Sequence, residues 1–136
     1  MSAKILIVDD EPDARRLLSI VLRLNHFEPL EAPGGQAALA QAAASRPDLI
    51  LLDVMMPDLD GYETCRRLKA DPATAAVPVV MISAKSQPSE IAAGLSAGAA
   101  AYLPKPINME ALLTLLERYA ARAADPASTP HGSVEL

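Results

Sequence analysis

Residues 5–12 read ILIVDDEP, a stretch that contains a short strand, an acidic turn and the start of a helix. Its first half, Ile5–Val8, is a continuous apolar run, which is typical of a strand covered on both faces of a sheet. Two aspartates follow at once, and Pro12 is a residue favoured in a first helical turn. Apolar residues then recur at helical spacing as far as Leu24. The stretch therefore predicts a buried strand that leads through an acidic turn into a helix.

The same succession of strand and helix recurs along the chain. Further strands are predicted at 28–32, 48–53, 77–82 and 100–103. Further helices are predicted at 36–45, before Ala70, at 90–97 and from Met109 to about Ala123, the last one capped by Asn108. This alternation predicts a parallel sheet with helices on both faces, the doubly wound α/β architecture. Residues 124–136 lack periodicity, so we expect a domain over 1–123 followed by a flexible tail or the start of a linker.

Reactive side chains stand where four of the predicted strands end. They are the pair Asp9 and Asp10, then Asp53, Ser83 and Lys105. In an open parallel sheet, sites form beyond the carboxyl ends of the strands, at the switch point of the strand order. We therefore expect three carboxylates, one hydroxyl and one ammonium group to meet in a shallow pocket.

The charges expected in this pocket indicate a metal ion. Three carboxylates close together repel and resist ionising at the same time. A divalent cation removes this conflict, and Mg²⁺ prefers six oxygen ligands at ~2.1 Å, some of them water. Asp10 and Asp53 are the natural direct ligands, with Asp9 acting through water. A carboxylate such as Asp53 can also attack phosphorus, while the metal and Lys105 neutralise the phosphoryl oxygens and Ser83 donates a hydrogen bond to one of them.

Composition excludes several other classes of function. The chain has 136 residues, a net charge of −5 and no cluster of Lys or Arg, so we expect no direct binding to nucleic acid. No apolar run reaches the ~18 residues of a membrane span, and there is no signal peptide, so we expect a cytoplasmic protein. Cys65, the single cysteine, is expected to be a structural thiol, and His26 and His131 are expected to be exposed without a metal or catalytic role.

Several motifs in order resemble the receiver domain of response regulators in two-component signalling. The matching segments are 8–12, 52–57 with Gly61 after it, 81–84 and 98–106, and the resemblance covers about residues 4–123. It implies a flavodoxin-like fold with five parallel strands in the order 2-1-3-4-5 and helices on both faces. It also implies a phospho-accepting module of a two-component or phosphorelay system, which signals by changing shape.

The resemblance also implies roles for individual residues. Asp53 accepts the phosphoryl group, Ser83 and Lys105 contact it, and Tyr102 is an aromatic switch that packs inward when Ser83 moves. The Mg²⁺ ligands are Asp10, Asp53 and the backbone carbonyl of Met55, with Asp9 completing the acidic pocket through water. The Lys105–Pro106 peptide bond is expected to be cis.

The implied donor is a phosphohistidine on a sensor histidine kinase or a histidine phosphotransfer protein. Its docking surface is predicted beside the site, on the first helix and the loop after Lys105. The residues predicted to form that surface are Ala14, Leu17, Pro106 and Met109. The downstream target stays open, as does the choice between a stand-alone regulator and one part of a longer chain.

Two other classes of protein share parts of this pattern. A Mg²⁺-dependent phosphatase that forms an aspartyl phosphate usually carries a second aspartate two residues after its nucleophile, where this chain has Met55. A flavin-binding module needs a phosphate-cradling loop after the first strand, whereas Asp9, Asp10 and Glu11 repel phosphate unless a metal is present. We therefore expect a signalling module that catalyses its own phosphorylation and slow dephosphorylation, and not an enzyme that turns over a metabolite.

Overall fold

The computed structural model describes residues 2–121, which form five strands and the helices between them. The strands are β1 Lys4–Val8, β2 Glu28–Ala32, β3 Leu49–Asp53, β4 Val79–Ser83 and β5 Ala101–Pro104. The helices are α1 Pro12–Leu24, α2 Gly35–Ser45, α3 Gly61–Ala70, α4 Pro88–Ser96 and α5 Met109–Leu116, and a π-helical turn over Glu117–Ala121 continues α5. Strand and helix alternate along the whole described chain, as predicted.

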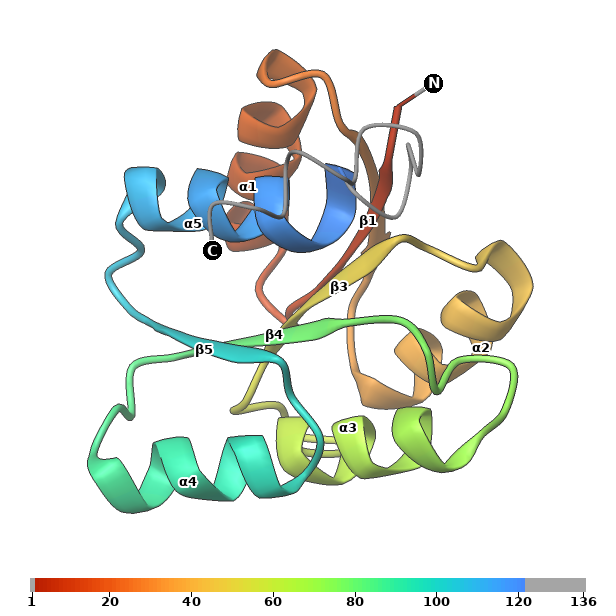
Figure 1. The fold of residues 1–136 in the computed structure, drawn as a ribbon, viewed down its shortest axis with the longest axis vertical. Coiled ribbons are helices and arrows are strands. Elements are labelled where there is room, and N and C mark those ends of the chain that lie inside the picture. Colours follow the sequence, from red (N-terminus) through yellow and green to blue (C-terminus); the bar gives the residue numbers. More distant parts are fainter. Residues whose placement is uncertain (1, 122–136) are drawn as a thin grey trace.

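The five strands form one parallel sheet in the order β2-β1-β3-β4-β5. This is the strand order that the family resemblance implied. Helices α1 and α5 cover one face of the sheet, and α2, α3 and α4 cover the other (Figure 1). The order reverses between β1 and β3, so the carboxyl ends of these two strands open onto the switch point at which such folds bind ligands.

Two apolar cores lie on the two faces of the sheet, because successive side chains of a strand point to opposite faces. Along β1, Ile5 and Ile7 pack towards α1 and α5, whereas Leu6 and Val8 pack towards the helices of the other face. The side chains of β3 and β4 are buried throughout, as expected for strands covered on both sides. The buried Cys65 thiol belongs to the core under α2 and α3, in agreement with a structural role.

Some predicted boundaries were wrong by one or two residues. Strand β4 begins at Val79 and not at Val77, because Pro78 has no N–H and offers the sheet only its carbonyl, which accepts from Ile50 N at 3.0 Å. Helix α4 begins at Pro88, two residues before its predicted start, and the Glu90 carboxylate folds back to accept from Gln87 N at 3.0 Å. Asn108 caps α5 as predicted, through a bond from Ala111 N at 2.9 Å.

Part of the sequence-based interpretation lies outside the described residues. The predicted end of the last helix near Ala123, the tail at 124–136 and His131 all belong to this part. His26 is described and is exposed, as predicted. Among the helices of residues 2–121, none combines the length and the apolar character that a membrane span needs.

Candidate functional site

Three carboxyl groups meet beyond the carboxyl ends of β1 and β3. Asp9 and Asp53 are buried, with 4% and 7% of their surface exposed, whereas Asp10 is exposed. Each of the three contributes a carboxylate oxygen to a group whose members all lie within 4.8 Å of one another. The parallel register brings Val8 level with Leu52, and this places the residues that follow β1 beside the end of β3. The sheet thus assembles the acidic cluster that the sequence predicted.

Lys105 brings a positive charge to this cluster from the loop after β5. Its Nζ lies 3.4 Å from Asp53 Oδ1 and 3.8 Å from Asp9 Oδ2. Lys105 N donates to the Ser83 carbonyl at 2.9 Å, which ties the base of the side chain to the end of β4. The Lys105–Pro106 peptide bond is cis, as predicted. Lys105 therefore lies between two carboxylates and faces the predicted phospho-acceptor.

Burial has a larger effect on the pKa of Asp53 than the positive charge of Lys105 has. The pKa of the Asp53 carboxyl is raised above its ordinary value of 3.8, first by burial and further by the negative charges of Asp9 and Asp10. Lys105 acts in the opposite direction through its charge and its hydrogen bond. Because the ammonium group does not fully compensate the carboxylates, added positive charge near Asp53 stabilises its ionised form.

Ser83 and Tyr102 lie on neighbouring strands beside the cluster. Ser83 is fully buried, and its Oγ accepts a hydrogen bond from Lys85 N at 3.0 Å, which leaves the hydroxyl proton for another acceptor. The half-buried Tyr102 donates its hydroxyl to the Lys85 carbonyl at 2.5 Å, so both residues contact the loop between β4 and α4. The inward movement of Tyr102 stays a prediction.

A second tyrosine, which the sequence analysis did not single out, lies next to Tyr102. Tyr62 on α3 donates its hydroxyl to the Glu90 carbonyl of α4 at 3.3 Å. Burial, followed by the contact with Tyr102, raises the pKa of Tyr62 to about 12. An aromatic residue one position after a helix start is ordinary core composition, so its sequence position carried no signal of this contact.

Arg15 is another contact residue that sequence reasoning missed. Its guanidinium donates to the Asp9 carbonyl at 2.7 Å and pairs with Glu31 of β2 at 3.1 Å. Ser19 donates to the same Glu31 carboxylate at 2.9 Å. The Asp9 carboxylate in turn accepts from Glu11 N at 2.9 Å. These bonds hold the acidic turn after β1. Because Arg15 binds a backbone carbonyl of Asp9, no side-chain pattern in the sequence indicated this contact.

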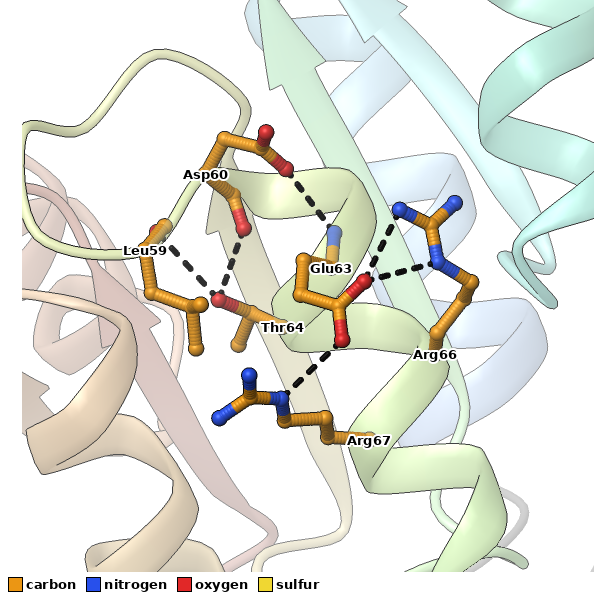
Figure 2. A network of polar contacts seen from close by, with 6 residues as sticks. All are labelled: Leu59, Asp60, Glu63, Thr64, Arg66 and Arg67. Atoms are coloured by element: carbon orange, nitrogen blue, oxygen red, sulfur yellow. Dashed lines mark hydrogen bonds and ion pairs between the residues drawn. The ribbon is translucent and has the colours of Figure 1, made fainter.

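The loop after β3 ends in a polar network at the start of α3. The Asp60 carboxylate caps this helix by accepting from Glu63 N at 2.8 Å, and Thr64 Oγ1 donates to the Asp60 carbonyl, also at 2.8 Å (Figure 2). Glu63 pairs with Arg66 and Arg67, each at 3.0 Å (Figure 2). The two arginines thus belong to the solvent-exposed surface of α3.

Two hollows lie near the carboxyl end of β3, and Asp53 lines one of them. One, of about 420 Å³, is lined by Asp9, Asp53 and Lys105 together with all four predicted docking residues, Ala14, Leu17, Pro106 and Met109. Leu17 and Met109 are 58% and 38% exposed, so two large apolar side chains at the border of this hollow are accessible to solvent. The other hollow, of about 600 Å³, lies between the loop after β3 and α4, and its lining includes Met55, Lys85 and Tyr62.

A five-stranded parallel sheet in the order β2-β1-β3-β4-β5, with an acidic cluster at its switch point, defines a doubly wound α/β module with a candidate metal site. Residues 5–117 match the response regulator receiver domain family, and the chain belongs to this family. The relatives include the response regulator PleD of Caulobacter vibrioides, 48% identical over 108 residues that cover 79% of this chain and 24% of PleD. They also include the DNA-binding response regulator MtrA of Mycolicibacterium smegmatis, 38% identical over 92% of this chain and 54% of MtrA.

Solved structures agree with this assignment. The chemotaxis protein CheY4 of Vibrio cholerae superposes with a TM-score of 0.82 at 34% identity, over 88% of this chain and 99% of CheY4. The receiver domain of the sensor histidine kinase PA1611 from Pseudomonas aeruginosa, solved with a magnesium ion coordinated in the active-site cleft, gives 0.81 at 29% identity, over 88% and 98%. The chain is thus a receiver domain, and neither the phosphatase nor the flavin-binding alternative is favoured. It spans about a quarter to a half of the length of the curated relatives named above.

Proposed function

We propose that Asp53 of this receiver domain accepts a phosphoryl group from a partner phosphohistidine, with Mg²⁺ as cofactor. The observation that carries the proposal is the position of the Asp53 carboxylate. It is buried at the end of β3, beside the carboxylates of Asp9 and Asp10 and 3.4 Å from Lys105 Nζ. A carboxylate, a cation and neighbouring metal-binding oxygens are the groups that transfer to aspartate needs.

The donor set fits Mg²⁺. All three side-chain groups are carboxylates, and hard oxygen ligands of this kind suit this ion. The raised pKa of Asp53 indicates that its ionised form lacks compensating positive charge. Asp10, Asp53 and the Met55 carbonyl would hold the ion, with Asp9 acting through water, and the ion would supply positive charge to the phosphoryl oxygens. The magnesium found in the PA1611 receiver domain supports this choice.

The chain's own groups account for the transfer. An Asp53 carboxylate oxygen attacks phosphorus, the new O–P bond forms, and the P–N bond to the donor imidazole breaks as that ring leaves and takes up a proton. Lys105 lies within 4 Å of both Asp53 and Asp9, so its ammonium group can move onto a phosphoryl oxygen over a short distance. The Ser83 hydroxyl donates to another of these oxygens, and Tyr102 packs inward behind it as the signal. The module hydrolyses its own aspartyl phosphate slowly and turns over no metabolite.

The donor protein docks at the hollow beside α1. Ala14 and Leu17 on α1 and Pro106 and Met109 after β5 border the same space as Asp53, so a partner seated there brings its phosphohistidine to the acceptor. Leu17→Glu places a charge on this apolar border and should block transfer from a histidine kinase or a histidine phosphotransfer protein. Labelling by acetyl phosphate should stay at the wild-type rate, because that donor needs no docking surface. Transfer from the partner at the wild-type rate would place docking elsewhere.

We also propose that this domain acts in the cytoplasm and does not itself contact nucleic acid. The net charge of −5 and the pairing of Arg66 and Arg67 with Glu63 support the second point. The DNA-binding relative MtrA is nearly twice as long as its matched region. A gel-shift experiment with this chain and random-sequence duplex DNA at low salt should show no complex.

Phosphorylation with a small donor tests the proposed function. The protein is incubated with acetyl phosphate in Mg²⁺ or in EDTA, and the added phosphoryl mass is measured on the intact chain. We expect labelling in Mg²⁺ only and none in Asp53→Asn. Asp71→Asn is the matched control, because Asp71 is an exposed aspartate at the C-terminal end of α3, whose other end packs on Asp53, and it should label like wild type. Equal labelling in EDTA, or labelling of Asp53→Asn, would contradict the proposal.

A further inference from the structure

Asp58, in the loop after β3, binds the start of a helix that is distant in the sequence. Its Oδ1 accepts from Gly35 N at 3.2 Å and its Oδ2 from Gln36 N at 3.1 Å. These are the first two N–H groups of α2, which have no partner within the helix. The bonds from Gln36 and Gly35 lower the pKa of Asp58 below its ordinary value, as expected for a carboxylate that accepts backbone N–H groups at a helix start.

Helix α2 depends on this distant carboxylate because its own N-cap residue is Gly34, which has no side chain to serve as a cap. The backbone of Gly34 is extended, with φ of −174°, so any residue could adopt it. The space around Gly34 is restricted instead, since a Cβ there would lie 2.8 Å from Asp58 Oδ1. The missing side chain at position 34 is therefore what allows Asp58 to reach the helix.

The same loop is fixed near Asp53 and at α3. Gly61 N donates to the Val54 carbonyl at 2.8 Å, and a Cβ on Gly61 would lie 2.6 Å from the Asp53 carbonyl oxygen. Asp60 caps α3 at the far end of the loop (Figure 2). Residues 54–60 are thus held against β3 and α3, and Asp58 adds the attachment to α2. Met55, whose carbonyl is the proposed metal ligand, lies in the part of the loop between Asp53 and Asp58.

We propose that Asp58 is a positioning residue, whose attachment to α2 holds the loop 54–60 in the conformation that presents the Met55 carbonyl and Asp53 to Mg²⁺. The inference rests on the proposed function, because it concerns the same metal site. Asp58 contacts neither the metal nor the phosphoryl group, and it acts through the loop. Partners of this kind, which orient direct ligands, commonly affect metal affinity about tenfold or more.

Gly34 allows the two roles of Asp58 to be separated. Gly34→Ser gives α2 a cap of its own, since serine is among the preferred N-cap residues. Its Cβ also occupies the space of the Asp58 carboxylate, which lies at the end of a flexible side chain and moves away. The helix then stays capped while the loop loses its attachment. Asp58→Ala, in contrast, removes the cap and the attachment together.

The experiment compares Gly34→Ser, Asp58→Ala and the double variant with wild type. Asp71→Ala is the matched control, since Asp71 also accepts a backbone bond, from Ala73 N at 2.9 Å, but far from the site. Hydrogen exchange is followed at residues 35–36 and 54–60, and Mg²⁺ affinity is measured by calorimetry. We expect faster exchange at 54–60 and about tenfold weaker Mg²⁺ binding in all three variants. The Gln36 amide should be exposed only in Asp58→Ala, because an N-cap serine at position 34 accepts from the second or third helical N–H, whereas the Gly35 amide loses its partner in every variant. The control should match wild type at both segments and in Mg²⁺ affinity.

The outcomes separate the two proposals. If the loop of Gly34→Ser exchanges faster but Mg²⁺ affinity stays at the wild-type value, the positioning role is overturned. Unchanged exchange of the loop in Asp58→Ala would also overturn it. Restored affinity in the double variant would reduce Asp58 to a helix cap and also overturn it. If wild-type protein neither binds Mg²⁺ nor labels with acetyl phosphate, the proposed function fails. The exchange data from the same samples would still support the attachment if 54–60 opens in the variants, and would overturn it if not.

Discussion

Asp53 and Asp58 stand in neighbouring parts of one segment, yet their carboxyl groups meet opposite surroundings. Asp53 is buried at the end of β3, where burial and two neighbouring carboxylates raise its pKa. Asp58 is exposed in the following loop, where two backbone N–H groups lower its pKa. The fold thus compensates one negative charge with its own backbone and leaves the other for Lys105 and an external cation. A buried charge without compensation lowers the stability of the folded protein, and such groups are common at functional sites.

The largest effect should follow the removal of the uncompensated charge. Asp53→Asn keeps the shape of the side chain but replaces the nucleophilic carboxylate with an amide. We therefore expect complete loss of labelling by acetyl phosphate. We also expect the folded protein to melt at a higher temperature than wild type at pH 7 without Mg²⁺, because burial disfavours the ionised carboxyl that is removed. Added Mg²⁺ should raise the melting temperature of wild type much more than that of the variant. A lower melting temperature for Asp53→Asn would show that Lys105 compensates Asp53 after all.

The next effect concerns Gly61, which packs on the backbone of Asp53 and directly follows the loop that contains Asp58. Its missing side chain lets the start of α3 pack directly on the Asp53 carbonyl, since an added Cβ would lie 2.6 Å from that oxygen. Gly61→Ala should therefore destabilise the fold by about 1–3 kcal/mol, the range for overpacking a well-packed site. Urea unfolding measures this cost, and the labelling rate shows whether Asp53 is displaced. A variant as stable as wild type would mean that backbone movement here is easy.

The contrast between the two aspartates also predicts opposite pH dependences of stability. The pKa of Asp53 in the folded protein lies above the ordinary value of 3.8, so its ionisation lowers stability as pH rises from about 4 through that raised value. The pKa of Asp58 lies below its ordinary value, so its contribution is present above about pH 4 and is lost as pH falls through the lowered value.

Urea unfolding at pH 3 and pH 7 without Mg²⁺ measures this difference in wild type, Asp53→Asn and Asp58→Asn. From pH 3 to pH 7, Asp53→Asn should gain stability relative to wild type, and Asp58→Asn should lose it. We expect each change to be smaller than the cost of Gly61→Ala. If both variants shift in the same direction, the two carboxyl groups do not differ in the way the structure indicates.

The acidic pocket could be predicted from the sequence because it depends on local patterns and one rule of topology. Apolar runs that end at Asp9, Asp53 and Ser83 identify strands, and parallel strands bring their carboxyl ends to one edge. The bond between Asp58 and the start of α2 has no such signal. It joins a loop to a helix start that is distant in the sequence, and it depends on the space left by the missing side chain of Gly34. Arg15 likewise binds a backbone carbonyl, an acceptor that every residue offers.

The smallest effect should come from the residues that border the approach to Asp53 from the larger hollow. Met55 and Lys85 both line that hollow, and both side chains are exposed. Val54, which directly follows Asp53, lines it too, so we expect water to reach a phosphoryl group on Asp53 past these two side chains. Hydrolysis needs a water held in line with the O–P bond and activated by a polar group. Met55 offers no hydrogen bond, and protonated Lys85 is a poor base. The aspartyl phosphate should therefore be long-lived, in contrast to what an amide or carboxylate at these positions would give.

Met55→Asn, alone or with Lys85→Glu, places such groups beside the phosphoryl group and should speed loss of the label several-fold, a change of about 1 kcal/mol in the barrier. The decay of phosphorylated protein after removal of acetyl phosphate measures the rate. Met55→Leu is the matched control, because it changes the shape but offers no hydrogen bond, and it should decay like wild type. Equal acceleration in Met55→Leu would assign the effect to space and not to orientation of water. Unchanged or slower decay in the double variant would show that water does not approach from this side. We would then expect water to approach through the hollow beside α1, whose lining includes Asp53 and Lys105.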